Sequence, residues 1–160
     1  MQYRVVVISD THGRFHPLYQ IVEKHKQEAV CFLHLGDGQH EVEDIISLYP
    51  ELRFYSVPGN CDFGAQGPMV RSITIGSKTI LFTHGHTYHV KHGLYHLKQA
   101  ARSQHADIAL YGHTHCSYTE YDDGLYIMNP GSPVQPRNGP ASYGIIDITD
   151  AGIVLNIVKL

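Results

Sequence analysis

Three short apolar runs, separated by helical segments, constrain the fold of this chain more than any other feature of its sequence. Residues 5–8 form a continuous β-branched run, and residues 30–35 and 54–57 are two further apolar runs. Such runs are typical of strands that are buried on both faces. The alternation of strand, helix, strand, helix and strand predicts parallel βαβ units, in which helices cover a sheet.

The segments between these runs have the apolar spacing of amphipathic helices. One face of each predicted helix is apolar, with Leu18, Ile21 and Val22 in the first and Val42, Ile45, Ile46 and Tyr49 in the second. Pro17 suits the first turn of a helix, and Pro50 ends the second one. Both helices are therefore expected to pack one face against the sheet.

The second half of the chain predicts a different strand arrangement. Residues 70–75 and 79–83 flank a short Gly76-Ser77-Lys78 turn, a helix follows near Leu94 and Leu97, and residues 108–111 form another strand. Four later strands, at residues 118–121, 125–128, 143–148 and 153–158, are expected in antiparallel succession. Together the elements predict one α/β domain over residues 1–160, with a mixed two-layered sheet system flanked by helices.

Polar residues follow five of the predicted strands, each time beside a glycine. They are Asp10, His12, Asp37, Asn60, His84, His113 and His115. Ligands in α/β proteins bind outside the carboxyl ends of the strands, so these seven side chains are expected to converge on one cleft. Each motif alone has an ordinary explanation, such as a helix cap or a turn, but five coincidences at the same strand ends favour a metal site.

The composition of this set indicates two metal ions. Seven nitrogen and oxygen ligands exceed the four that a tetrahedral zinc ion takes, and two ions that share a carboxylate accommodate them better. Mn, Fe, Ni and Zn all accept imidazole, carboxylate and amide ligands. Paired metals activate water and stabilise both oxygens in phosphoryl transfer, which predicts a small phosphate ester as substrate.

The chain has 13 histidines, and most of those outside this set have simpler explanations. We expect His25, His89, His92, His96 and His105 on exposed surfaces and His34 inside a strand. His16, His40 and His86 are in or near the predicted loops and are candidate substrate contacts.

Charge and cysteine content exclude several classes of protein. Lys and Arg number 12 against 15 Asp and Glu, so no broad cationic surface for nucleic acid or an anionic membrane is expected. The three cysteines form no CxxC motif, and no apolar stretch approaches a membrane span, so a cytoplasmic location is expected. The chain has 11 tyrosines, which can supply apolar surface for self-association, so a homo-oligomer is a candidate assembly.

The five motifs together resemble the calcineurin-like metallophosphoesterase superfamily, and most closely its small YfcE-like phosphodiesterase branch. They are Asp10-x-His12, Gly36-Asp37, Gly59-Asn60, His84-Gly85-His86 and Gly112-His113-x-His115. The resemblance implies a four-layer α/β/β/α sandwich with two mixed sheets and a two-metal site at the sheet edge. A loop at Asn129-Pro130-Gly131-Ser132 also resembles one that small members have near the site, and we assign it no catalytic role.

The resemblance also implies a role for each residue. Asp10, His12 and His115 would hold the first metal, Asp37 would bridge both, and the second metal would take Asn60, His84 and His113. Manganese is the first expectation for the metal, and the predicted catalytic group comprises Asp37, Asn60, Asp62 and His86. Many members have His directly after the metal-binding Asn, whereas this chain has Cys61, which leaves the proton donor for the leaving group open.

Two functions follow from the sequence. The first is a metal-dependent phosphodiesterase, with Arg14 and Arg137 as candidate cations near the phosphate. The second is an interaction scaffold on the same fold, similar to a retromer subunit, in which catalysis is weak or lost. All seven predicted ligands are present, which favours the enzyme.

Overall fold

The β-branched run at residues 5–8 forms the centre of the first sheet in the computed structural model, which describes residues 1–160. The strand order of this sheet is β10 (Gly152–Lys159), β9 (Ser142–Thr149), β1 (Tyr3–Ile8), β2 (Ala29–His34) and β3 (Phe54–Ser56). Strands β1, β2 and β3 are parallel neighbours, as the βαβ pattern predicts, and β9 and β10 extend the sheet with antiparallel pairing.

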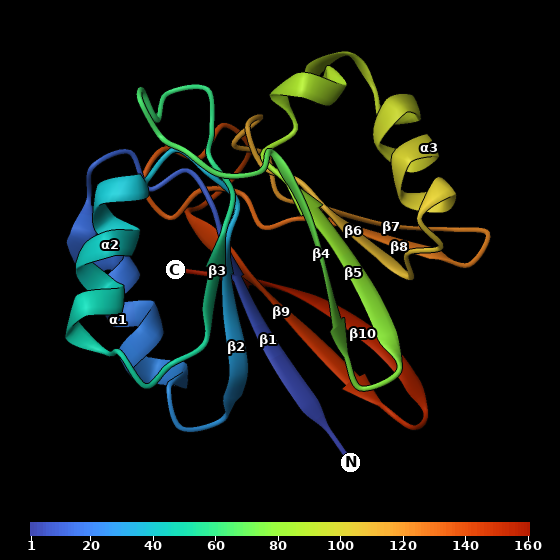
Figure 1. Cartoon of the computed structure of the whole chain (residues 1–160), viewed down its shortest axis with the longest axis horizontal. Coiled ribbons are helices and arrows are strands. Elements are labelled where there is room, and N and C mark those ends of the chain that lie inside the picture. Colours follow the sequence, from blue (N-terminus) through green and yellow to red (C-terminus); the bar gives the residue numbers. More distant parts are fainter.

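A second mixed five-stranded sheet packs against the first (Figure 1). Its strand order is β4 (Val70–Ile75), β5 (Lys78–Thr83), β6 (Ile108–Leu110), β8 (Leu125–Asn129) and β7 (Tyr118–Asp122). The predicted turn at residues 76–78 connects β4 to β5, and a second tight turn at residues 123–124 connects β7 to β8. The predicted antiparallel succession is wrong at one step, because β8 and β9 belong to different sheets.

Helices cover the outer face of each sheet (Figure 1). The helices are α1 (Phe15–His25), α2 (Gln39–Leu48) and α3 (Tyr95–Ser103), with two 3-10 turns, η1 (His86–Tyr88) and η2 (Val90–His92). Alternation along β1 sorts its side chains, so that Val5 and Val7 pack between the sheets and Val6 packs under α1 and α2. The α/β/β/α sandwich is therefore confirmed, with a separate apolar cluster beneath α3. None of these helices combines the length and apolarity needed to cross a membrane.

His25 is buried, which contradicts the expectation of an exposed position. Its side chain lies at the end of the buried face of α1, in the same stripe as Leu18 and Val22. The Nε2 atom lies 2.7 Å from the hydroxyl of Tyr143, and the Nδ1 atom lies 2.6 Å from a carboxylate oxygen of Glu28. These two hydrogen bonds satisfy the ring inside the protein, as burial of an imidazole requires.

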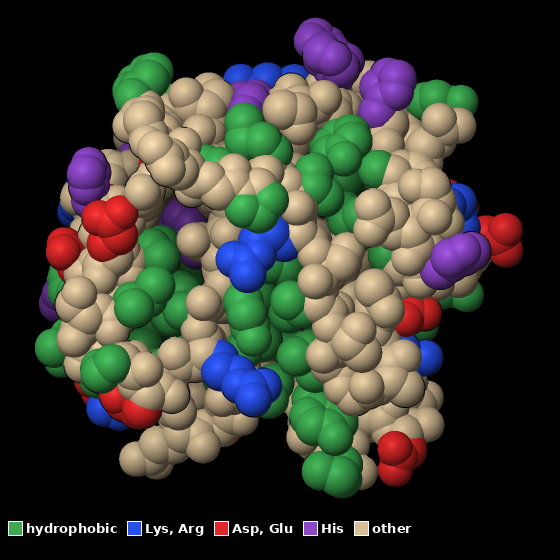
Figure 2. All heavy atoms as spheres, viewed as in Figure 1, with side chains coloured by type: hydrophobic (Ala, Val, Ile, Leu, Met, Phe, Trp, Pro, Cys, Tyr) green, Lys and Arg blue, Asp and Glu red, His purple; other side chains and the backbone are tan.

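The other expectations for histidines outside the cluster hold. His34 is buried within β2, where its Nε2 atom lies 3.0 Å from the hydroxyl of Thr11. His89, His92, His96 and His105 are exposed. In Figure 2, histidine side chains project at the top of the view, over the segment that carries η1, η2 and the start of α3 in Figure 1. On this face, Lys and Arg side chains stand in small separate groups.

The carboxyl ends of five strands meet at one edge of the sandwich. Strands β1, β2 and β3 supply three of the loops from the first sheet, and β5 and β6 supply two from the second. The predicted side chains therefore come from two sheets rather than from one row of strands. This arrangement places them on opposite walls of a shared site.

Candidate metal centre

The carboxylate of Asp10 is the most deeply buried charged group of the centre, with no exposed surface. Its Oδ2 atom accepts hydrogen bonds from the Ser9 hydroxyl at 2.6 Å and from the backbone N–H of His113 at 3.0 Å. Its Oδ1 atom has no hydrogen-bond donor although it is buried. A buried carboxylate oxygen without a donor is costly, so this atom indicates a place for a cation.

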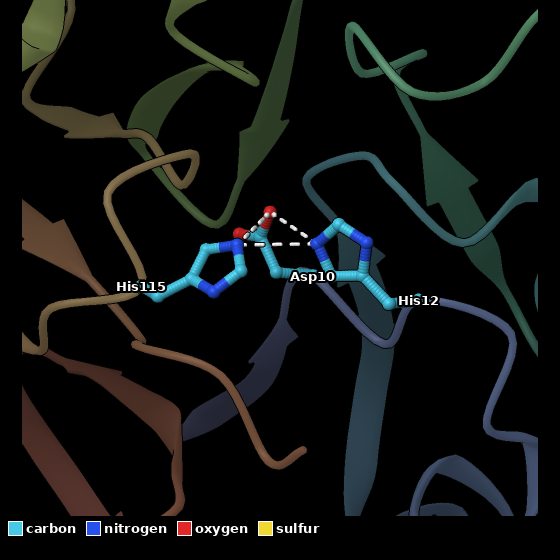
Figure 3. Close-up of side chains that lie close together, drawn as sticks. All are labelled: Asp10, His12 and His115. Atoms are coloured by element: carbon cyan, nitrogen blue, oxygen red, sulfur yellow. Dashed lines mark hydrogen bonds and ion pairs between the residues drawn. The ribbon is translucent and has the colours of Figure 1, made fainter. Parts of the chain in front are cut away.

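Three imidazole rings surround the unpartnered oxygen of Asp10. The Nε2 atoms of His115, His12 and His84 lie 3.3, 3.6 and 3.9 Å from it. The Nε2 atoms of His12 and His115 also lie 3.1 Å from each other (Figure 3). Asp10, His12 and His115 thus point their donor atoms at one shared point.

In Asp37, as in Asp10, one carboxylate oxygen accepts a backbone hydrogen bond and the other faces imidazole rings. Its Oδ1 atom accepts a hydrogen bond from the backbone N–H of Cys61 at 2.7 Å. Its Oδ2 atom lies 3.3 Å from the Nε2 atom of His84 and 3.7 Å from that of His12. Because His12 and His84 are on opposite sides of the centre, Oδ2 stands between two groups of donors.

The second group of donors collects around His84. Its Nε2 atom lies 3.1 Å from the Oδ1 atom of Asn60 and 3.2 Å from the Nδ1 atom of His113. The structure therefore brings all seven predicted side chains together, in two groups that share Asp37. Their donor set of imidazole, carboxylate and amide fits divalent metal ions of the Mn, Fe, Ni and Zn type.

Backbone carbonyl groups fix the tautomers of two of these histidines. The Nδ1 atom of His84 lies 2.7 Å from the carbonyl oxygen of Leu35, and that of His115 lies 2.8 Å from the carbonyl oxygen of Gln135. A carbonyl oxygen only accepts, so each Nδ1 carries the hydrogen and donates it. In its neutral form, each ring then turns the Nε2 lone pair toward the centre, which is the orientation that a metal ligand needs.

The pKa shifts follow from burial and from these contacts. Burial alone would raise the pKa of Asp10, but the contacts with the His115 and His12 rings outweigh it and hold this pKa far below its usual range. Burial would likewise raise the pKa of Asp37, but the contact with His84 lowers it overall. Both carboxylates therefore carry negative charge at neutral pH, as metal ligands must.

The histidines of the centre titrate differently from one another. Burial and then the positive charge of His84 lower the pKa of His113 to about 4. Burial would lower the pKa of His84 itself, but Asp37 and Asp10 raise it overall. The two carboxylates thus attract positive charge to the centre, and a divalent ion can replace a bound proton there.

Five of the seven residues have a left-handed backbone conformation, which is unusual for residues with a side chain. The φ angles are 59° for Asp10, 44° for His12, 58° for Asp37, 72° for His113 and 58° for His115. Such conformations cost of order 1 kcal/mol or more each and collect at functional sites. This backbone strain accompanies the turning of several side chains from different loops into one small volume.

Two glycines make room for the carboxylates. A Cβ atom at Gly59 would lie 2.1 Å from the Oδ1 atom of Asp37, and one at Gly112 would lie 2.8 Å from the Oδ2 atom of Asp10. Neither position therefore accepts a side chain without displacing a carboxylate. The glycines beside the polar motifs are thus part of the centre.

Asp62 holds the loops of the centre together. Its carboxylate accepts hydrogen bonds from the backbone N–H groups of Asp37, Gly38, Gln39 and Gly59, at 2.7 to 3.1 Å. Four donors occupy both oxygens, so these contacts position the Asp37 loop against the Asn60 loop. The predicted catalytic role of Asp62 stays a prediction, and its observed contacts are with backbone groups.

His86 and Cys61 lie at the border of the centre. The ring of His86 lies 5.3 Å from that of His84, and its Nδ1 atom is buried without a partner. Burial and the charge of His84 lower the pKa of His86, so its ring is neutral. The thiol of Cys61 groups with His12 and Asp37, with donor atoms within 4.8 Å of one another. His16 and His40 are exposed and make no hydrogen bond to the centre.

Three residues that support the centre were given no role by the sequence analysis. Ser9 donates to Asp10, as described above, and the hydroxyl of Ser132 donates to the backbone carbonyl of Asp10 at 2.8 Å. The side-chain amide of Asn129 donates to the carbonyl of Gly112 and to the hydroxyl of Thr114. For Asn129 and Ser132, the distinctive Asn129-Pro130-Gly131-Ser132 motif was the available signal. The contacts that these two residues make are not visible in the sequence.

Comparison with known proteins decides the family. Residues 3–151 match the sequence profile of the calcineurin-like phosphoesterase superfamily domain. The chain belongs to this superfamily. The family is metal-dependent, and the Asp and His groups described above could hold a metal ion.

Several relatives support the assignment. The chain is 35% identical over 153 residues to the probable metallophosphoesterase YsnB of Bacillus subtilis, covering 94% of this chain and 88% of the relative. It is 30% identical over 115 residues to the phosphodiesterase YfcE of Escherichia coli K12, covering 66% of this chain and 56% of the relative. It is also 31% identical over 114 residues to vacuolar protein sorting-associated protein 29 of Schizosaccharomyces pombe, covering 65% and 60% of the two chains.

A solved structure from Streptococcus pneumoniae TIGR4, described as a predicted phosphoesterase, is also similar to this chain. It superposes with a TM-score of 0.88 at 27% sequence identity, covering 99% of this chain and 90% of that one. The shared fold extends over the whole sandwich, so the resemblance expected from the five motifs is confirmed.

Proposed function

We propose that this chain is a phosphodiesterase that holds two divalent metal ions, with manganese as the first candidate and iron, nickel or zinc as alternatives. The observation that carries the proposal is the unpartnered Oδ1 atom of Asp10, which faces three imidazole Nε2 atoms. The similarity to the phosphodiesterase YfcE supports a diester as the substrate.

The seven residues divide into two ligand sets. Asp10, His12 and His115 would hold the first ion, and Asn60, His84 and His113 would hold the second. Asp37 would bind both ions through its Oδ2 atom, because this oxygen lies within 3.7 Å of both His12 and His84. Two bound ions supply the positive charge that stabilises a phosphoryl group and activates a water molecule.

The residues of the chain provide orientation and charge. Leu35 and Gln135 hold two imidazoles in the ligand tautomer through their carbonyl groups. Asp62 fixes the loop of Asp37 through four backbone contacts. Protonation of the leaving group falls to solvent, because the lowered pKa of His86 leaves its ring neutral, and burial and the nearby Asp37 raise the pKa of Cys61 and keep it a neutral thiol.

Metal analysis with a paired assay tests the proposal. Purified protein with added Mn²⁺ should cleave bis(p-nitrophenyl) phosphate, and a chelator should abolish the activity. The alternative function is an interaction scaffold with little or no catalytic turnover. The similarity to vacuolar protein sorting-associated protein 29 supports this alternative. Protein that binds no metal at any ratio and cleaves neither diester nor monoester would establish the scaffold instead.

A further inference from the structure

A cavity of about 510 Å³ lies against the loop that carries His113 and His115. Its walls include Tyr111, which follows β6, and Tyr118, which begins β7. The cavity does not include any of the seven residues of the metal centre in its lining. It is therefore an open pocket at the surface, beside the centre and distinct from it.

The charged side chains that line this cavity are both cations. They are Lys91, from η2, and Arg137, from the loop before β9, and no Asp or Glu lines the cavity. The ion pairs of Lys and Arg side chains in this chain involve Arg4, Lys26, Lys98 and Arg102. Lys91 and Arg137 thus keep their full charge available, although the chain as a whole has a net charge of −3.

The two cations are anchored by ordered backbone. Lys91 follows Val90, which is buried in the apolar cluster beneath α3. The backbone N–H of Arg137 donates to the carbonyl of His115 at 2.9 Å. Next to Arg137, the side chain of Asn138 accepts from the N–H of Ser117 and donates to its carbonyl. The cavity walls are therefore fixed relative to the metal centre.

Thr114 forms the wall between the cavity and the centre. It lines the cavity, whereas His113 and His115 on either side of it turn their rings to the centre. Asn129 holds the Thr114 hydroxyl at 2.9 Å.

We propose that this cavity binds a second phosphate group of the substrate while the scissile phosphodiester is at the metal centre. The inference rests on the phosphodiesterase function proposed above and narrows its substrate class to diesters that carry a further phosphate. Two unpaired cations suit a group that carries up to two negative charges, and an Arg side chain matches the geometry of phosphate oxygens. The hydroxyls of Thr114 and Ser117 add polar contacts, and Tyr111 provides an apolar wall.

A matched pair of esters tests this inference. One is p-nitrophenyl 2-hydroxyethyl phosphate, and the other carries a phosphate in place of the hydroxyl. With Mn²⁺ present, the wild-type KM should be about tenfold or more lower for the phosphorylated ester. Lys91→Gln should remove most of this difference and leave the KM for the hydroxyethyl ester unchanged, and the Lys91→Gln/Arg137→Gln double variant should remove the difference entirely. Lys24→Gln, which removes the same charge from the exposed face of α1, should change neither value.

The outcomes separate the two proposals. Equal effects of Lys91→Gln on both esters, or no preference in the wild-type protein, would overturn the cavity assignment while the phosphodiesterase stands. If neither ester is cleaved, the proposed function fails, and NMR titration of the isolated protein with inorganic phosphate still tests the cavity. Phosphate should shift the amide signals of Ser117 and Asn138 in the wild-type protein but not in the double variant. Identical shifts in both proteins would exclude the site.

Discussion

The Oδ1 atom of Asp10 lies 3.3 Å from the Nε2 atom of His115 and has no hydrogen-bond donor. Since the Nδ1–H of His115 donates to a backbone carbonyl, Nε2 is the ring atom that faces this oxygen. Two electron-rich atoms at this separation repel each other unless positive charge lies between them. The geometry of this pair is therefore that of two ligands of one cation.

Asp37→Asn tests the shared ligand. The substitution keeps the shape of the side chain but removes the charge that faces both His12 and His84. We expect metal content to fall below two ions per chain and diester cleavage to fall by about 100-fold or more. Asp44→Asn, on the exposed surface of α2, is the control and should behave as the wild type. Unchanged activity of Asp37→Asn would mean that the centre is wrongly assigned.

Cys61→His tests the proton donor. Cys61 lies beside Asp37 and its thiol is neutral, so it is a poor acid for a departing alkoxide. An imidazole at this position should accelerate cleavage of an ester with a poor leaving group by about tenfold or more, and change the p-nitrophenyl ester much less. The ratio of the two kcat values is the readout, with Cys61→Ser as the control. A uniform change for both esters would argue against a role in proton donation.

Asp62→Ala tests the loop contacts. Four backbone N–H groups lose their acceptor in this variant, and each unsatisfied donor costs about 1 kcal/mol or more where water cannot replace it. We expect a clear fall in the thermal unfolding midpoint and weaker metal binding. Asp62→Asn keeps one accepting oxygen and should lie between Asp62→Ala and the wild type. An unfolding midpoint that neither variant changes would contradict the positioning role.

The pair of Arg4 and Asp147 predicts a pH dependence of stability far from the metal centre. Arg4 donates to both oxygens of Asp147 at 2.8 and 3.0 Å, and this contact lowers the pKa of Asp147 below its ordinary value of 3.8. The stabilisation is therefore present above this ordinary value and lost as pH falls through the lower folded-state pKa.

Asp147→Asn should accordingly destabilise the protein by about 1 kcal/mol at neutral pH, because the pair is partly exposed. The difference should shrink toward zero in strongly acidic buffer. Urea unfolding at several pH values measures it, and a difference that grows as the pH falls would contradict the assigned direction.

The strands, and the meeting of seven polar side chains at one edge of the sandwich, are the part of this structure that the sequence predicts well. Apolar periodicity places the helices and strands, because buried faces repeat with the geometry of each element. The position of Asp37 directly after a buried strand predicts that it reaches the sheet edge. Separating the strands into two sheets is beyond such reasoning, since β8 and β9 are neighbours in sequence but pair with different partners.

The details that make the site work depend on tertiary contacts. His12 and His115 have a left-handed backbone because their rings turn toward one point. The residue type histidine does not by itself predict this conformation. The buried position of His25 depends on Tyr143, which is 118 residues away in the sequence. The four backbone contacts of Asp62 likewise exist only after the loops that follow β2 and β3 have met.

Anomalous diffraction from crystals grown with Mn²⁺ tests the central claim most directly. Two manganese peaks are expected per chain, one among Asp10, His12 and His115 and one among Asn60, His84 and His113, with Asp37 between them. Peaks at both positions, lost together in Asp37→Asn crystals, would support the two-metal centre. A single peak, or none at saturating Mn²⁺, would contradict it.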